Sequence, residues 1–240
     1  MAIAPFLAMT AAEMGNAADF PQKSAWMACH FSPYGLGLSN LPQDLPPHAL
    51  IVLDDITPIR GHLPEIITQQ LLTCTEGSSC RGVLLDFQRG LCPETAELAK
   101  HLVSTLPCPV IVSAGYAKAF PCPVFLPPVP PSMPLQEYLS PWKDREIWLE
   151  IGLEGETLTL TERGCEIAPL PYADFGPEGF AEEALHCHYR IETNKTSVRF
   201  TLWRTKEDLA ALLEEAERLG VTGAVGLYQQ LQGFVCKGSG

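Results

Sequence analysis

The segment Gly82-Val83-Leu84-Leu85-Asp86-Phe87 decides the fold class, because it is apolar at nearly every position and carries one carboxylate near its end. A continuous apolar run, without polar alternation, is typical of a parallel strand buried on both faces. A helix-like segment follows at 93–105, and Pro93 stands at its first position, where a missing N–H does no harm. The segment therefore predicts one strand–helix unit of a parallel sheet.

The same rhythm extends to both sides of this segment. Strands are expected at 26–31, 49–54, 109–113 and 223–228, and helices at 63–73 and 205–219. The last helix has the clearest limits, because Thr205 and Asp208 form a capping-box pattern at its start and Gly220 ends it. Repeated strand–helix units predict a (β/α) TIM-type barrel that forms a single domain over residues 1–240.

The middle of the chain interrupts the rhythm. Residues 121–134 carry seven prolines, which favour an extended chain and could leave the count of barrel strands or helices incomplete. Residues 146–170 alternate apolar and polar side chains around glycine turns, so we expect an antiparallel β insertion there, with strands at 147–151 and 157–161. The barrel pattern is expected to resume after residue 185, with strands at 186–192 and 197–203.

Composition excludes several classes of function. The formal charge of −12 and the absence of a basic stripe argue against nucleic acid as a partner. The interior apolar runs are far shorter than the roughly 20 residues of a membrane span. Nine cysteines without a CxxC pair favour reduced thiols and a cytoplasmic location, although the apolar N-terminal stretch leaves secretion open as the alternative. No nucleotide-binding or serine-hydrolase motif is present, so no cofactor is expected, and the oligomeric state is not determined by the sequence.

The segment 81–88 resembles the signature of family 18 glycoside hydrolases, the chitinases and their spore-cortex relatives. These enzymes carry Asp-Gly-x-Asp-x-Asp-x-Glu at the end of a barrel strand. Gly82 matches the glycine, Asp86 matches the last aspartate, and Phe87 matches the usual aromatic residue. The C-terminal segments 201–209 and 220–230 are similar to the family's closing helix and last strand. The resemblance implies a saccharide of the N-acetylglucosamine type as the ligand.

This chain departs from that signature at the positions of the family's catalytic carboxylates. Gln88 stands where the family keeps its acid–base glutamate, and Arg81 and Leu84 stand where it keeps two further aspartates. In the family, the glutamate protonates the leaving oxygen, and the aspartate two residues before it orients the N-acetyl group that attacks. A glutamine cannot donate that proton, and general acid catalysis typically contributes about 10²–10⁴ in rate. The resemblance therefore implies a non-hydrolytic domain in which Asp86 and Gln88 remain at the barrel mouth.

Other residues compete for a role at the same mouth. Asp54 and Asp55 end a neighbouring strand and could supply an acid and a base, or they could accept backbone N–H groups of the following loop. Four aromatic residues near strand ends could stack against sugar rings or pack in the core: Phe87, Tyr116, Trp203 and Tyr228. Glu150 and Glu192 could face the mouth, but the solvated faces of antiparallel strands routinely carry such residues.

No metal site is predicted. In His186-Cys187-His188 at most two side chains of a strand share a face, and no third ligand at a usual zinc spacing is near. Three hypotheses remain. The first is a saccharide-binding domain without hydrolysis, and the second is an active hydrolase that uses Asp54, Asp55 and Asp86. The third is a structural or interaction barrel with no saccharide role.

Overall fold

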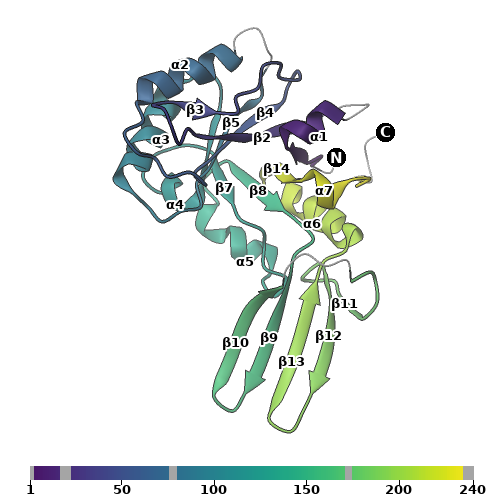
Figure 1. Ribbon diagram of the computed structural model, residues 1–240. Coiled ribbons are helices and arrows are strands. Elements are labelled where there is room, and N and C mark those ends of the chain that lie inside the picture. The colour runs from purple at the N-terminus through teal and green to yellow at the C-terminus, as the bar shows by residue number, and fades with distance from the viewer. Residues whose placement is uncertain (1–2, 17–22, 76–79, 171–174, 235–240) are drawn as a thin grey trace.

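A closed ring of eight parallel strands forms the body of the molecule in the computed structural model, which describes residues 3–16, 23–75, 80–170 and 175–234. The ring closes because β1 pairs with β14 on one side and with β2 on the other. Around the ring the order is β1, β14, β8, β7, β6, β5, β4 and β2 (Figure 1). The strands are β1 Phe6–Met9, β2 Ser24–Phe31, β4 Leu50–Asp54, β5 Gly82–Asp86, β6 Val110–Ser113, β7 Val124–Leu126, β8 Ile147–Ile151 and β14 Val221–Leu227. The TIM-type barrel is confirmed, and its ring is complete.

Helices follow most of the barrel strands and lie outside the ring. They are α1 Ala11–Asn16, α2 Pro64–Thr75, α3 Pro93–Thr105, α4 Ala114–Ala117, α5 Leu135–Leu139, α6 Lys206–Arg218 and α7 Tyr228–Leu231, with a 3-10 turn at Ser140–Trp142. After β2 the chain forms the short strand β3, Leu38–Ser39, which pairs antiparallel with the end of β2. None of these helices, within the described ranges, is long and apolar enough to cross a membrane.

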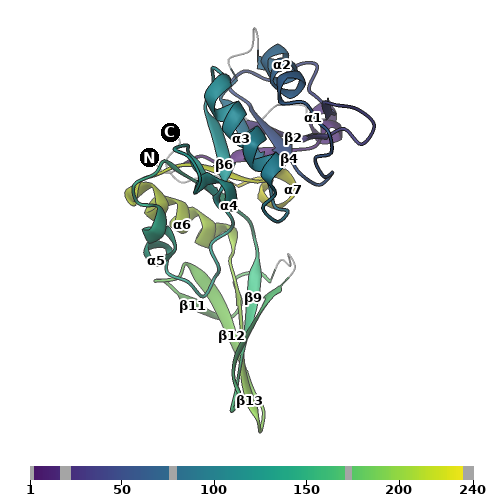
Figure 2. The same ribbon diagram turned by 90° about the vertical axis from the view of Figure 1, so that its left-hand side faces the viewer.

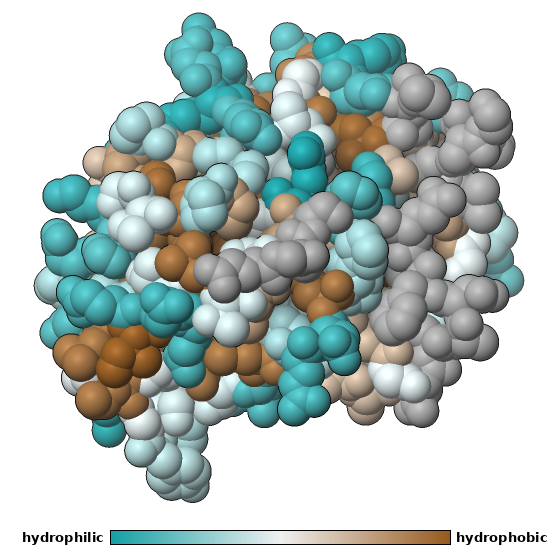
Figure 3. Space-filling view, turned by 90° about the horizontal axis from the view of Figure 1, so that it is seen from above, coloured by the Kyte–Doolittle hydropathy of each residue, from teal (hydrophilic) through white to brown (hydrophobic). Residues whose placement is uncertain are grey.

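The apolar side chains form two layers, one inside the ring and one between the ring and the helices. Alternate residues of each strand point inward, as strand geometry requires. The inner layer consists of Phe6, Ala8, Ala25, Leu50, Val52, Leu84, Ile111, Phe125, Trp148 and Val225. Seen from above, the surface of the barrel carries hydrophobic residues in small groups among hydrophilic ones (Figure 3).

The antiparallel insertion is larger than expected and begins later. Five strands form a second sheet in the order β10, β9, β13, β12 and β11, which projects away from the barrel (Figures 1 and 2). The strands are β9 Gly155–Thr161, β10 Gly164–Leu170, β11 Phe180–Glu182, β12 Cys187–Thr193 and β13 Ser197–Trp203. The expected bounds of 146–170 were wrong at both ends, because β12 and β13, assigned to the resumed barrel pattern, pair with β11 and β9.

The strand Ile147–Ile151 was also misassigned. It is the barrel strand β8, which pairs in parallel with β7 and β14 and not with the strands of the insertion. The proline-rich stretch conceals a further barrel strand, β7, because Val124–Leu126 contains no proline. Local alternation cannot distinguish these cases, since the partners of β8 lie far from it in the sequence. The N-terminal strand β1 was not predicted as a strand.

Arg204 connects the insertion to the proline-rich loop through hydrogen bonds. Its buried guanidinium donates to the backbone carbonyls of Val129 and Pro130 on one side and of Leu185 and His186 on the other. α6 then begins directly behind it at the capping box of Thr205, as the sequence predicted. The insertion therefore leaves the barrel between β8 and α6.

Candidate functional site

Asp86 and Gln88 lie together at the C-terminal mouth of the barrel. Leu84 belongs to the inner layer, so Asp86, two residues later at the end of β5, points to the same side. The amide Nε2 of Gln88 donates to both carboxylate oxygens of Asp86, at 3.2 Å and 3.1 Å. Burial raises the pKa of Asp86, the hydrogen bond from Gln88 opposes that shift, and the nearby carboxylates of Asp54 and Asp55 add to it. The structure thus brings together the two residues that carry the resemblance.

Asp54 and Asp55 end the neighbouring strand β4, but they do different things. Asp55 is buried, and its carboxylate accepts hydrogen bonds from the backbone N–H groups of Gln88 at 2.9 Å and Arg89 at 3.0 Å. It therefore holds the loop that positions Gln88. Asp54 faces the mouth, accepts the backbone N–H of Ile56 at 3.0 Å, and has a pKa raised mainly by burial. Because both oxygens of Asp55 are engaged, it is a poor candidate for acid–base chemistry.

Glu150 lies at the mouth, which the sequence offered only as the alternative to a solvated strand face. Trp148 belongs to the inner layer, so Glu150, two residues further along β8, points into the mouth. Burial raises its pKa to about 7, and the carboxylates of Asp86 and Glu154 contribute to that rise. The signal was present as alternation along Trp148-Leu149-Glu150, but it was attributed to a solvated antiparallel strand.

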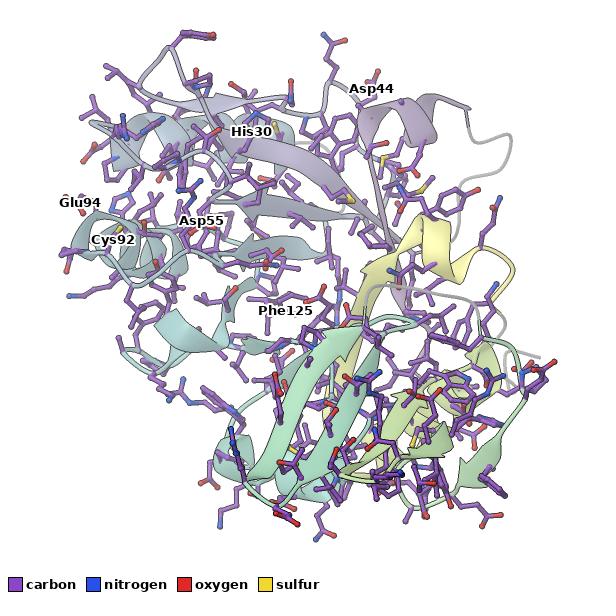
Figure 4. All side chains as sticks on the ribbon, turned by 60° about the horizontal axis from the view of Figure 1, so that its bottom comes forward. His30, Asp44, Asp55, Cys92, Glu94 and Phe125 are labelled. Atoms are coloured by element: carbon purple, nitrogen blue, oxygen red, sulfur yellow. The ribbon has the colours of Figure 1, made fainter. Side chains whose placement is uncertain are left out.

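A cavity of about 300 Å³ opens at this end of the ring. Four acidic residues line it, Asp54, Asp55, Asp86 and Glu150, above an apolar floor that includes Val52, Leu84 and Val225. Phe125 from β7 also lines it, and both Phe125 and Asp55 are labelled in Figure 4. A second cavity of about 600 Å³ continues beside it over the loops after β5, β6 and β7. Asp86, Gln88, Phe125 and Glu150 line both cavities.

The four predicted aromatic residues are placed differently from one another. Phe87 is buried outside the ring, where its side chain packs against Phe31 and Tyr116 at ring-centroid distances of 5.9 Å and 5.6 Å. Tyr116 is mostly buried and lines the second cavity. Trp203 is 1% exposed in the insertion and donates to the carbonyl of Gly176, so it does not lie at the mouth.

Tyr228 begins α7, and its hydroxyl contacts the side-chain amide of Gln232 at 3.1 Å. It is not among the residues that line either of these cavities. The apolar rim of the mouth instead comes from Ile56, which is 73% exposed, and from Leu91, which is 69% exposed. These two residues lie on the loops after β4 and β5, and composition alone did not distinguish them from ordinary loop residues.

The histidines of the insertion bind carboxylates of α6. His186 Nε2 lies 2.5 Å from Glu215 Oε2, and His188 Nδ1 lies 2.8 Å from Asp208 Oδ2. These two histidine–carboxylate contacts therefore connect the insertion to helix α6 of the barrel. Among the residues that the structure describes, no three His, Cys, Asp or Glu side chains are grouped so that they could hold a metal ion.

The arrangement at the mouth is suited to holding a neutral polar ligand. Asp86 supplies an oriented acceptor and Gln88 an amide, while Phe125 and the apolar floor provide non-polar contact. Saccharides present this combination of hydroxyl or amide donors and C–H faces, and pockets that fix orientation with a few polar groups are typical of small-ligand sites. The position two residues after Asp86, where the resemblance to family 18 enzymes expects a glutamate, holds the amide of Gln88.

Comparisons with known proteins bear on the fold. No protein-family model and no curated protein sequence matches the chain. A solved structure of a chitinase from Chromobacterium violaceum is similar, with a TM-score of 0.53, 12% identity and coverage of 93% of each chain. The spore cortex-lytic enzyme SleL of Bacillus cereus matches with a TM-score of 0.49 and 12% identity over 85% of this chain. This chain spans 63% of that enzyme's length.

Proposed function

We propose that the barrel mouth binds a saccharide of the N-acetylglucosamine type and does not hydrolyse it by the route in which the N-acetyl group attacks. The proposal starts from a chain with the fold of a chitinase-like glycoside hydrolase. One observation carries it: the amide of Gln88 occupies the position beside Asp86 and donates to both of its oxygens. An amide retains its protons at any ordinary pH, so it cannot act as a general acid.

The expected binding mode follows from the cavity. Asp86 accepts a hydrogen bond from the N–H of an acetamido group, and Gln88 keeps that carboxylate oriented. Phe125 offers its ring to the apolar face of the sugar. The cavity of about 300 Å³ accommodates one sugar unit at its deepest point, and the second cavity extends it along the β5–β7 loops. These open cavities argue against a mouth that is merely filled by the proline-rich stretch.

A titration calorimetry experiment tests the proposal. The wild-type chain and Asp86→Ala are titrated with a tetramer of N-acetylglucosamine, and Asp44→Ala serves as a control because Asp44 is exposed and lies outside both cavities. We expect binding by the wild type and by the control, and a loss of at least about tenfold in affinity for Asp86→Ala, because a half-buried charged acceptor is removed. Absence of binding by the wild type would exclude the saccharide role.

A turnover assay with a fluorogenic N-acetylglucosamine oligomer tests the second half of the proposal. We expect no release of fluorophore by the wild type. Release that disappears in Asp86→Ala would contradict the non-hydrolytic assignment. Gln88→Glu restores a carboxyl group beside Asp86, so turnover gained by that variant alone would support the view that the missing acid is the reason for inactivity.

A second candidate function is hydrolysis with Glu150 as the acid. It is favoured by the placement of Glu150 in the same cavity as Asp86, and by its pKa of about 7, which keeps the carboxyl partly protonated at neutral pH. This replaces the hypothesis based on Asp54 and Asp55 together, since Asp55 serves the backbone of the next loop. Turnover by the wild type that is lost in Glu150→Gln but retained in Gln88→Ala would establish it.

A further inference from the structure

The insertion sheet has two unlike faces. In a sheet, residues paired directly across neighbouring strands have their side chains on the same face. The register of β10, β9, β13 and β12 therefore assigns each residue to one of the two faces. One face carries mainly Thr, Arg and Glu side chains. The other, which we term the apolar sheet face, carries Leu158, Leu160, Ile167, Phe180, Tyr189, Ile191, Val198 and Phe200. Such a division normally means that the apolar side is covered by a second layer.

Only the end of the apolar sheet face nearest the barrel is covered. There Leu202 is buried, and the carboxylate of Glu156 accepts the backbone N–H of Ser132 from the proline-rich loop. Further out, Ile167 is 59% exposed and Ile191 is 46% exposed. In the described part of the chain, Figures 1 and 2 show no helix or strand against the outer half of the sheet. On the face of the barrel that Figure 3 shows, hydrophobic residues form separate groups among hydrophilic ones.

The edges of the sheet are less suited to a partner than its face. The outer strand β10 contains Pro169, which cannot donate to an added strand, and the opposite outer strand β11 has only three residues. The aromatic rings on the face are not arranged as a flat platform for sugars. Phe180 is inclined by 33° to Tyr189, and Tyr189 by 44° to Phe200. The aliphatic residues around them favour a protein surface.

A second copy of this chain fits that surface as the partner in a weak dimer. Strands about 4.8 Å apart and up to about 23 Å long give a sheet face of roughly 500 Å² per copy, and part of it is covered by the barrel. The pair therefore buries less than the roughly 1,000 Å² of a stable interface, which is the range of a transient, concentration-dependent association. The chain carries a net charge of −12, which would oppose self-association at most surfaces, but the outer part of the apolar sheet face contains no charged side chain.

We infer that two copies of the chain associate face to face through their apolar sheet faces, related by a two-fold axis. Sheets packed in this way lie about 10 Å apart with strands inclined by about 30°, and their side chains interdigitate. In a two-fold arrangement the same patch is used on both copies, so no second surface is needed. Each insertion projects away from its own barrel, which leaves the outer part of the apolar sheet face clear of the barrel (Figure 2).

Sedimentation equilibrium over a range of concentrations tests this inference. We expect the wild type to shift from the 26.2 kDa of one chain to twice that mass as concentration rises. Ile167→Lys on the edge strand β10 and Ile191→Lys on the interior strand β12 each place a charge on the apolar sheet face and should raise the dissociation constant at least about tenfold. Both positions are largely exposed, so these substitutions leave no cavity in the folded chain.

Thr159→Lys is the matched control. It adds the same charge to the interior strand β9, but on the opposite face, and should dimerise as the wild type does. Circular dichroism of all three variants checks that the sheet is formed. A wild type that stays at the mass of one chain up to about 1 mM would overturn the inference. So would a dimer that Thr159→Lys weakens as much as Ile167→Lys, because the interface would then lie elsewhere.

Discussion

The replacement of Glu150 by glutamine gives the most direct test of the raised pKa of this carboxyl group at the barrel mouth. The pKa of this carboxyl rises from the ordinary 4.5 to about 7, chiefly because of burial and because Asp86 lies close. At about 1.4 kcal/mol for each pKa unit, that difference corresponds to roughly 3 kcal/mol of stability. The side chain is partly open to the cavity, so solvent screening makes this an upper value. Glutamine keeps the shape and removes the charge.

The pH dependence has a definite sign. Below about pH 4.5 the carboxyl is protonated in both the folded and the unfolded chain, so it contributes no change with pH. Between about pH 4.5 and 7 the folded chain retains a proton that the unfolded chain has released, so raising the pH lowers the free energy of unfolding. Above about pH 7 the loss is complete. Glu150→Gln lacks this loss and should be the more stable protein at high pH.

Urea unfolding of the wild type and of Glu150→Gln across this range measures the effect. The difference in free energy of unfolding, variant minus wild type, should grow between pH 4.5 and 7 by up to about 3 kcal/mol and then stay level. Glu166→Gln, at an exposed glutamate of β10, corrects for the loss of one surface charge. A difference curve that is flat across this window would refute the placement of Glu150 in a desolvated cavity.

Three further predictions concern the scaffold around the site. Asp55→Ala should lower the free energy of unfolding by roughly 2–4 kcal/mol in urea titrations, because two backbone N–H groups lose their acceptor. Thr205→Ala should cost about 1 kcal/mol through loss of the helix cap, and Thr205→Ser should cost less; thermal unfolding distinguishes them. Gly223→Ala should cost about 1–3 kcal/mol because its Cβ would meet the ring of Trp148, whereas Gly90→Ala meets no atom within 4 Å and should be close to neutral in the same assay.

The sequence by itself determined the elements whose signals are local. The strands ending at Asp54 and Asp86 were predicted from continuous apolar runs, and the helix at Pro93–Thr105 was predicted with the bounds that the structure has. The capping box at Thr205 was also predicted and is present. Strand alternation was enough to place Asp86 and Gln88 on one side, because successive side chains point to opposite sides. Phe87, which was left open between sugar stacking and core packing, is buried in the core.

Only the tertiary structure decided which strands belong to the ring and which to the insertion. Ile147–Ile151 has the same local alternation whether it pairs with β9 or with β14, and its partner β14 lies some seventy residues away in the sequence. Pairing between distant segments depends on the closure of the whole barrel, and a short stretch of sequence carries no information about that closure. Glu150 lies in the cavity only because β8 is a barrel strand, so the assignment of that one strand also determined which carboxyl groups line the cavity.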